Sequence, residues 1–173
     1  MKKLILSAIA VCAFGITSAQ EGGFKAGVNV GMPMGDTSDV ASLAIGAEVA
    51  YMFPISDEFQ IGASVGYLTF MAKEVNEVDD LGIDTGNKVK PDNAAFLPIA
   101  ATAQYSFSEN IFVGADLGYA MGLSPDGNDG GMLYQPKVGY QTEKFEVYVG
   151  YRGIATEGTA TSSIGVGFNY KFF

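Results

Sequence analysis

Apolar and polar residues alternate with a period of two along most of the chain after residue 23. A period of two is typical of a β-strand with one apolar face, because successive side chains point to opposite sides. The pattern predicts eight strands, over residues 24–31, 43–51, 59–67, 97–106, 111–119, 132–141, 145–152 and 164–172. Each has about ten residues, the length that a tilted strand needs to cross a bilayer.

The connections between these strands differ in length. Short turns are expected around residues 54–58, 108–110 and 142–144. Longer polar or Gly-rich loops are expected at 32–41, 72–93, 124–130 and 155–161. Short turns at one end and long loops at the other are typical of bacterial outer-membrane barrels, whose two termini lie on the periplasmic side. We therefore expect one antiparallel up-and-down barrel, without a helix or an internal domain boundary.

The two faces of the predicted strands differ in chemistry. One face is almost entirely Val, Ile, Leu, Ala, Phe and Tyr, and the other is mostly Gly, Ser, Thr, Asn and Gln, with about one charge per strand. A soluble barrel would carry many more charges on its outer face. We therefore place the apolar face outward, toward lipid, and small polar residues in a narrow lumen. The predicted fold class is all-β, an eight-stranded antiparallel up-and-down transmembrane β-barrel.

Aromatic residues also follow the apolar face. Phe and Tyr side chains gather near the short turns, and Tyr67, Tyr119, Tyr134 and Tyr151 lie about six to eight residues higher along their strands. Outer-membrane barrels carry an aromatic girdle at each membrane interface. The spacing predicts two such girdles.

The start of the chain has the pattern of a secretory signal. A basic beginning precedes an apolar run over residues 4–16, and small residues follow at 17–19. We expect residues 1–19 to be cleaved and residues 20–173 to form the barrel domain. The only cysteine, Cys12, leaves with the signal, so no disulfide is expected.

Composition argues against several functions. The chain has no histidine, which excludes Ser-His-Asp triads and disfavours zinc sites, so we predict no catalytic residue, no cofactor and no metal. Loss of the two lysines of the signal takes the formal net charge from −9 to −11, which disfavours nucleic acid as a partner. The segment 126–130 resembles the start of a calcium loop but lacks its glutamate, and a Gly/Asp-rich turn is preferred.

Four charged residues are predicted to face the lumen at similar depth: Glu48, Asp116, Lys137 and Arg152. A charge in a narrow lumen is costly unless it is paired, so two acids and two bases should form a compensated cluster. Its role is left open between static packing and a gate that could open a conduit.

The sequence resembles a known family. The residues that carry the resemblance are Phe24–Gly31, Leu97-Pro98-Ile99, Pro136–Tyr140 and Asn169–Phe173. They are similar to the outer-membrane β-barrel domain family of small porin-like, OmpA-like and OmpX-like barrels. The resemblance implies residence in the outer membrane. It also implies that Tyr170, Phe172 and Phe173 form the signal read by the barrel-insertion machinery.

The expected partners are outer-membrane lipid, lipopolysaccharide and the barrel-insertion machinery, and the expected state is a monomer. Three functions remain open at this point. The first is a non-catalytic barrel with a structural or surface-interaction role. The second is a small-solute porin or channel, and the third is a soluble lipocalin-like carrier.

Overall fold

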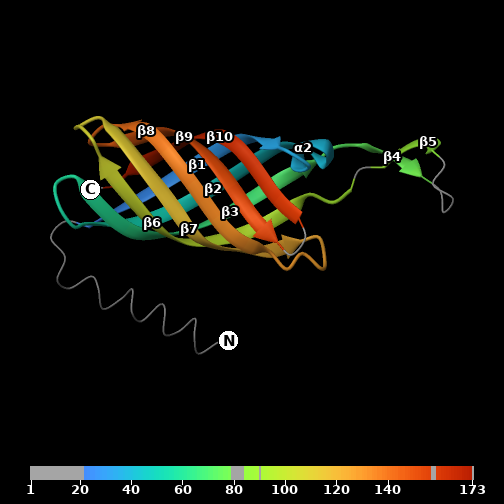
Figure 1. Cartoon of the computed structure of the whole chain (residues 1–173), viewed down its shortest axis with the longest axis horizontal. Helices are drawn as coiled ribbons and strands as arrows, with labels where there is room; N and C mark the ends of the chain where they lie inside the picture. Colours follow the sequence, from blue (N-terminus) through green and yellow to red (C-terminus); the bar gives the residue numbers. More distant parts are fainter. Residues whose placement is uncertain (1–21, 79–83, 90, 157–158, 173) are drawn as a thin grey trace, which may run out of the picture.

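Eight antiparallel strands close into a barrel in the computed structural model, which describes residues 22–78, 84–89, 91–156 and 159–172 (Figure 1). The strands are β1 (Gly23–Met34), β2 (Ala41–Pro54), β3 (Phe59–Ala72), β6 (Ala94–Ser106), β7 (Ile111–Ser124), β8 (Gly131–Gln141), β9 (Phe145–Thr156) and β10 (Thr159–Lys171). The predicted fold class is confirmed. The proposed signal segment, residues 1–19, lies outside the described residues.

The barrel closes where its first strand meets its last. β1 pairs with β10 from Lys25 opposite Lys171 to Met34 opposite Ser162. The other seven neighbouring pairs join strands that are consecutive around the sheet. Closure removes the free edges that a bilayer could not satisfy with hydrogen bonds. The strands are longer than predicted, mainly toward the long loops.

Two long loops contain regular structure, which the sequence did not predict. The first holds α2 (Thr37–Val40), a single helical turn. The loop after β3 holds β4 (Val75–Val78) and β5 (Asp84–Val89), which pair with each other beyond the barrel (Figure 1). All three elements have only four to six residues, so they are too short to carry a hydrophobic period that could reveal them. Among the described residues, no helix is long and apolar enough to span a membrane.

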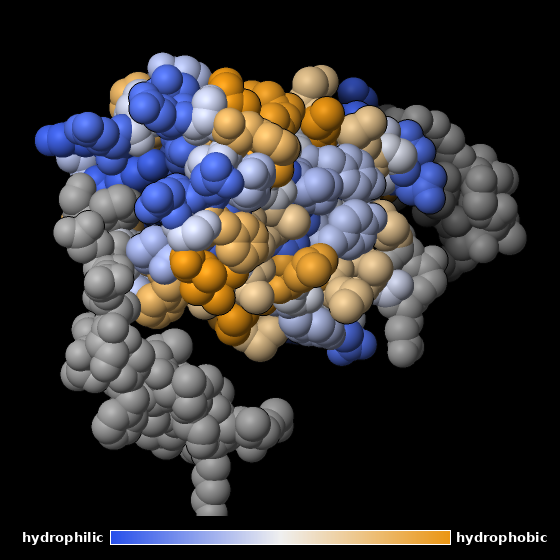
Figure 2. Space-filling view, turned by 60° about the vertical axis from the view of Figure 1, so that its left-hand side comes forward, coloured by the Kyte–Doolittle hydropathy of each residue, from blue (hydrophilic) through white to orange (hydrophobic). Residues whose placement is uncertain are grey.

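The side chains alternate between lumen and outer surface in the predicted phase. On the outside, Val28 is 60% exposed and Leu117 is 59% exposed. On the inside, Lys25 and Glu146 are 3% and 1% exposed. Figure 2 shows apolar side chains over the wall of the barrel, with hydrophilic residues gathered toward one end. Within the barrel wall, the strands therefore point their charged side chains into the lumen and their apolar side chains outward.

Aromatic rings on the outer wall are densest near the short turns. The pairs Phe24–Tyr51, Tyr105–Phe107 and Tyr170–Phe172 pack edge to face, with ring centroids 4.7–5.0 Å apart. Tyr67, Tyr119 and Tyr134 are exposed on the same wall, closer to the long loops. These two rows lie where the sequence placed the girdles.

We predict that an arginine on this wall is costly in proportion to its depth. Val65 is exposed near the middle of β3, and Leu123 is exposed at the long-loop end of β7. Val65→Arg should lower the free energy of unfolding in lipid vesicles by about 2–4 kcal/mol, and Leu123→Arg by about 0–1 kcal/mol. Equal losses in a urea titration would contradict an outer wall that faces lipid.

Candidate functional site

The lumen contains three layers of side chains along the barrel axis. The lower network lies next to the short turns and consists of Lys25, Gln104, Gln141, Glu146, Asn169 and Lys171. The central pairs consist of Glu48, Asp116, Lys137 and Arg152. The apolar plug lies nearest the long loops and consists of Leu68, Phe70, Phe96, Leu133 and Ile154 with neighbouring alanines. Because side chains alternate along a strand, every second residue points into these layers.

The first central pair joins two neighbouring strands. Lys137 Nζ on β8 lies 2.9 and 2.8 Å from the two carboxylate oxygens of Asp116 on β7. Gly114 is directly opposite Lys137, and a Cβ there would lie 3.2 Å from the lysine Cε. Gly114 therefore leaves space for the side chain of Lys137 to reach Asp116.

The second central pair crosses the lumen. Arg152 Nη2 on β9 lies 3.8 Å from Glu48 Oε2 on β2. The same guanidinium donates hydrogen bonds to Gln135 Oε1 at 2.6 Å and to Asn29 Oδ1 at 2.9 Å. Two hydrogen-bond acceptors and one carboxylate, from three different strands, thus fix one arginine, because its planar guanidinium donates in several directions.

The four charges chosen from the sequence therefore meet as two pairs. Glu48, Asp116 and Arg152, together with Gln135, border one small void of about 10 Å³. The geometry supplies compensation for each charge and leaves the choice between packing and gating open.

Tyr148 lies in the lumen close to both central pairs. Its hydroxyl donates to Glu48 Oε1 at 3.4 Å, and Lys137 Nζ lies 5.4 Å from its ring centroid. A Cβ at Gly167 would lie 2.2 Å from the ring, so the glycine is needed for the ring to lie flat against β10. The sequence analysis did not select this residue, although Tyr148 has the lumen phase of β9.

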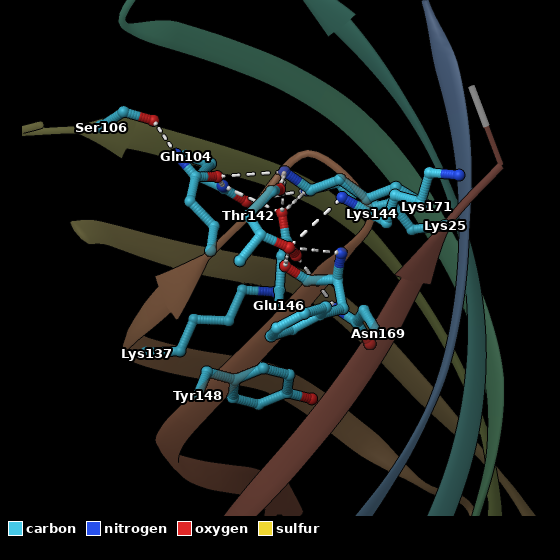
Figure 3. A network of polar contacts seen from close by, with 12 residues as sticks. Lys25, Gln104, Ser106, Lys137, Thr142, Lys144, Glu146, Tyr148, Asn169 and Lys171 are labelled. Carbon is cyan, nitrogen blue, oxygen red and sulfur yellow. Dashed lines mark hydrogen bonds and ion pairs between the residues drawn. The ribbon is translucent and has the colours of Figure 1, made fainter. Parts of the chain in front are cut away.

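The lower network is built around one carboxylate (Figure 3). Glu146 Oε1 lies 2.5 Å from Lys25 Nζ and 3.4 Å from Lys171 Nζ. Gln104 Nε2 donates to the same oxygen at 3.2 Å, and Asn169 Nδ2 donates to Oε2 at 3.3 Å. The sequence analysis missed this network because it considered only charges at middle depth. The signal was available, since both lysines and Glu146 have the lumen phase.

The apolar plug corrects the expectation of a polar lumen. Phe70 and Phe96 pack edge to face with centroids 6.1 Å apart, and Leu68, Leu133 and Ile154 are buried beside them. The signal was a local loss of alternation. At Tyr67-Leu68 an apolar residue stands in each phase, so one faces outward and the other inward.

Little space remains between these layers. The voids beside the central pairs measure about 20 and 10 Å³, each enough for one water molecule. A larger hollow of about 710 Å³ opens at the short-turn end, with Gln141 and Lys171 among its lining residues. The described lumen is thus open toward the short turns and packed toward the long loops.

The structure shows how the segment 126–130 is held. Asn128 Nδ2 donates to Ser124 O at 2.9 Å, and Asn128 Oδ1 accepts from Gly130 N at 3.2 Å. Gly127 and Gly130 have positive φ, which suits glycine in a turn. This agrees with the preferred turn. Among the described residues, no group of three or more acidic, His or Cys side chains could hold a metal ion.

The proposed insertion signal lies partly within the described residues. Tyr170 and Phe172 are exposed on the outer wall near the short turns, and Phe173 lies outside the described residues. Their role in insertion stays a prediction.

Comparisons with known proteins place the fold. No family model matches the chain, and no curated protein matches it. The crystal structure of Ail, the attachment invasion locus protein of Yersinia pestis, matches with a TM-score of 0.53 and 13% identity over 90% of this chain and 100% of that one. A de novo designed transmembrane β-barrel matches with a TM-score of 0.51 and 12% identity over 89% of this chain and 99% of that one. The chain has the fold of the eight-stranded outer-membrane β-barrels.

An outer-membrane barrel of this size has room for side chains and little else in its lumen. The lumen described above fits that rule. Every charged side chain that the structure places there has a partner of opposite sign within 4.0 Å. The likeness at this identity concerns the fold, and it assigns no role to these residues.

We predict that Glu146→Gln is strongly destabilising. The change removes the only carboxylate that the structure places within 4.0 Å of Lys25 and Lys171, and it leaves two buried ammonium groups without a counter-charge. The free energy of unfolding in lipid vesicles should fall by about 3–5 kcal/mol. Glu143→Gln, in the neighbouring exposed turn, is the matched control and should be nearly neutral. A loss below about 1 kcal/mol at Glu146 would contradict the network.

We also predict that Lys137 and Asp116 are coupled. Lys137→Met or Asp116→Leu alone leaves one buried charge unpaired, whereas the double replacement removes both charges. The double variant should therefore lose less stability than the sum of the single variants, by about 1–3 kcal/mol in a double-mutant cycle. Additive losses would show that the pair contributes nothing as a pair.

Proposed function

We propose that this chain is an integral protein of the bacterial outer membrane with a structural or surface-interaction role and no catalytic activity. One observation carries the proposal. The barrel exposes a continuous apolar wall and fills its lumen with paired charges and an apolar plug. Such a molecule is suited to crossing a bilayer and unsuited to holding or passing a solute.

The exposed wall argues against a soluble carrier. Val28, Leu117 and Val138 are all more than half exposed, and they lie on different strands around the barrel. Soluble proteins rarely expose contiguous apolar patches larger than a few hundred Å². A carrier would also need an internal ligand cavity, whereas the voids beside the central pairs hold about one water molecule each.

The packed lumen favours the structural or interaction role over the porin alternative. Solute arriving from the short-turn end would meet the lower network, then the central pairs, and finally the apolar plug. The same packing supports the absence of catalysis. The described lumen carboxylates are engaged by lysine or arginine, and no space for a substrate adjoins the central pairs.

The exposed charge favours some partners over others. Four of the ten basic residues lie in the lumen, and two more belong to the proposed signal. The surfaces outside the lumen therefore keep a large excess of acids, which disfavours nucleic acid. Ail has been solved with the heparin analogue sucrose octasulfate. For this chain we expect lipid and cationic partners instead, with the β4–β5 hairpin as the projecting element.

Fractionation and conductance test the proposed function together. The full-length chain, expressed in a Gram-negative host, should appear in the outer-membrane fraction and resist carbonate extraction. In planar bilayers the refolded barrel should give no stepwise current, because the plug and the central pairs close its lumen. Recovery in the soluble periplasm would favour the carrier, and long-lived uniform conductance steps would favour the porin.

A further inference from the structure

The outer wall has a hollow beside the seam of the barrel. It measures about 340 Å³ and crosses β9, β10, β1 and β2. Its side chains are Val30, Met32, Leu43, Val149, Ile164 and Val166. The backbone of two glycines that pair across the seam, Gly31 and Gly165, completes the lining. The hollow exists because only aliphatic side chains and methionine line it, whereas tyrosines stand on the wall elsewhere in this half of the barrel.

The helical turn α2 forms a rim at the long-loop end of the strands that line the hollow. α2 packs against β1, β2 and β10, three of the four strands that line it. Thr37 fixes this helical turn, because its hydroxyl donates to Ala160 O at 3.3 Å and accepts from Ser162 N at 3.0 Å. The apolar surface below and the polar turn above therefore belong to one rigid corner of the barrel.

The side chain of Lys73 is hydrogen-bonded to the same rim. The exposed Lys73 donates from Nζ to Ser38 O at 2.6 Å, and its backbone N–H donates to Val40 O at 2.8 Å. An ammonium has three donors. The contact with Ser38 uses one of them, so further donors can serve an anionic group at the membrane surface.

We propose that this corner binds one phosphate-bearing lipid of the leaflet next to the long loops. An acyl chain lies in the hollow and the phosphate meets Lys73. This inference rests on the proposed membrane location. The hollow is about twice the ~150 Å³ that holds one benzene molecule, so it has room for a stretch of hydrocarbon. A second copy is a poorer occupant, because stable protein interfaces bury more than about 1,000 Å².

Lys73 separates this lipid from the bulk lipid around it. The rim also carries two exposed acids, Asp36 and Asp39, so the preference for an anionic lipid depends on Lys73. Every part of the wall contacts hydrocarbon, but the hollow takes a chain at a fixed place, on the strands against which α2, with its bound Lys73, packs. A lysine near a membrane surface attracts anionic lipid with about 1 kcal/mol, which is about fivefold in affinity. The site should therefore retain an anionic lipid while the remaining annular lipid exchanges.

Lipid retention measures this site directly. The barrel is refolded in dimyristoylphosphatidylcholine vesicles that contain dimyristoylphosphatidylglycerol as a minor component, then extracted with mild detergent. Native mass spectrometry counts the lipids that stay bound. The unchanged protein should retain one phosphatidylglycerol per barrel. Val166→Phe fills the hollow and should lose most of it, whereas Val65→Phe makes the same change at similar depth on β3 and should retain it.

A second variant addresses the phosphate. Lys73→Gln should lower the preference for phosphatidylglycerol over phosphatidylcholine about fivefold and leave the hollow able to take a chain. If this preference is unchanged, the assignment of the phosphate to Lys73 is wrong. All variants are first compared for heat-modifiable migration on gels, which reports a closed barrel. Should Val166→Phe fail that comparison, Val30→Phe fills the same hollow from β1.

The outcomes separate the two proposals. Equal retention by Val166→Phe and Val65→Phe, or no retained lipid on the unchanged protein, would overturn the lipid site and leave the membrane location intact. Failure of the unchanged chain to enter vesicles at all would count against the proposed function itself.

Discussion

The pairing of β1 with β10 is the interaction on which the rest of this structure depends. Ten residue pairs, from Lys25–Lys171 to Met34–Ser162, turn a sheet with two open edges into a closed surface. Without it, both strands would present unpaired N–H and C=O groups, and each such group costs several kcal/mol in hydrocarbon. Closure also encloses the lumen. The contacts that cross the lumen, such as Arg152 with Glu48 and Glu146 with Lys25, form because the seam is shut.

Closure with only eight strands forces a second consequence, since the lumen is too narrow for bulk water. Charges that alternation sends inward must then find partners within the barrel. Glu146 does so with two lysines, and Arg152 does so by reaching Glu48 across the lumen. Glycines opposite or beside these side chains, such as Gly114, supply the space that the long side chains need. Polar pairing and glycine placement are therefore one feature of the same strands.

The sequence was sufficient for the strands and for their orientation. A period of two is a direct imprint of strand geometry, and the apolar character of one phase, as in Val65 and Val149, identified the outside. It was insufficient for α2 and for the β4–β5 hairpin, because elements of four to six residues are too short to leave a periodic signal. The central charges were found because each has the lumen phase of its strand at middle depth. Their division into two pairs depends on strand shear, which spacing along the chain does not report.

The plug shows where alternation alone misleads. Residues such as Leu68 and Phe70 lie beyond the predicted end of their strand, and their phase points inward. An inward apolar cluster is reasonable at the long-loop end, because the polar groups of the lower network already occupy the end that is open to water. The two ends of the lumen therefore differ, with the buried charges nearer the short turns and the main apolar cluster nearer the long loops. The long-loop end of the lumen is closed by apolar contacts, which hold no charge that a change of pH or salt could affect. The apolar plug, more than the central pairs, therefore sets how tightly this barrel is sealed.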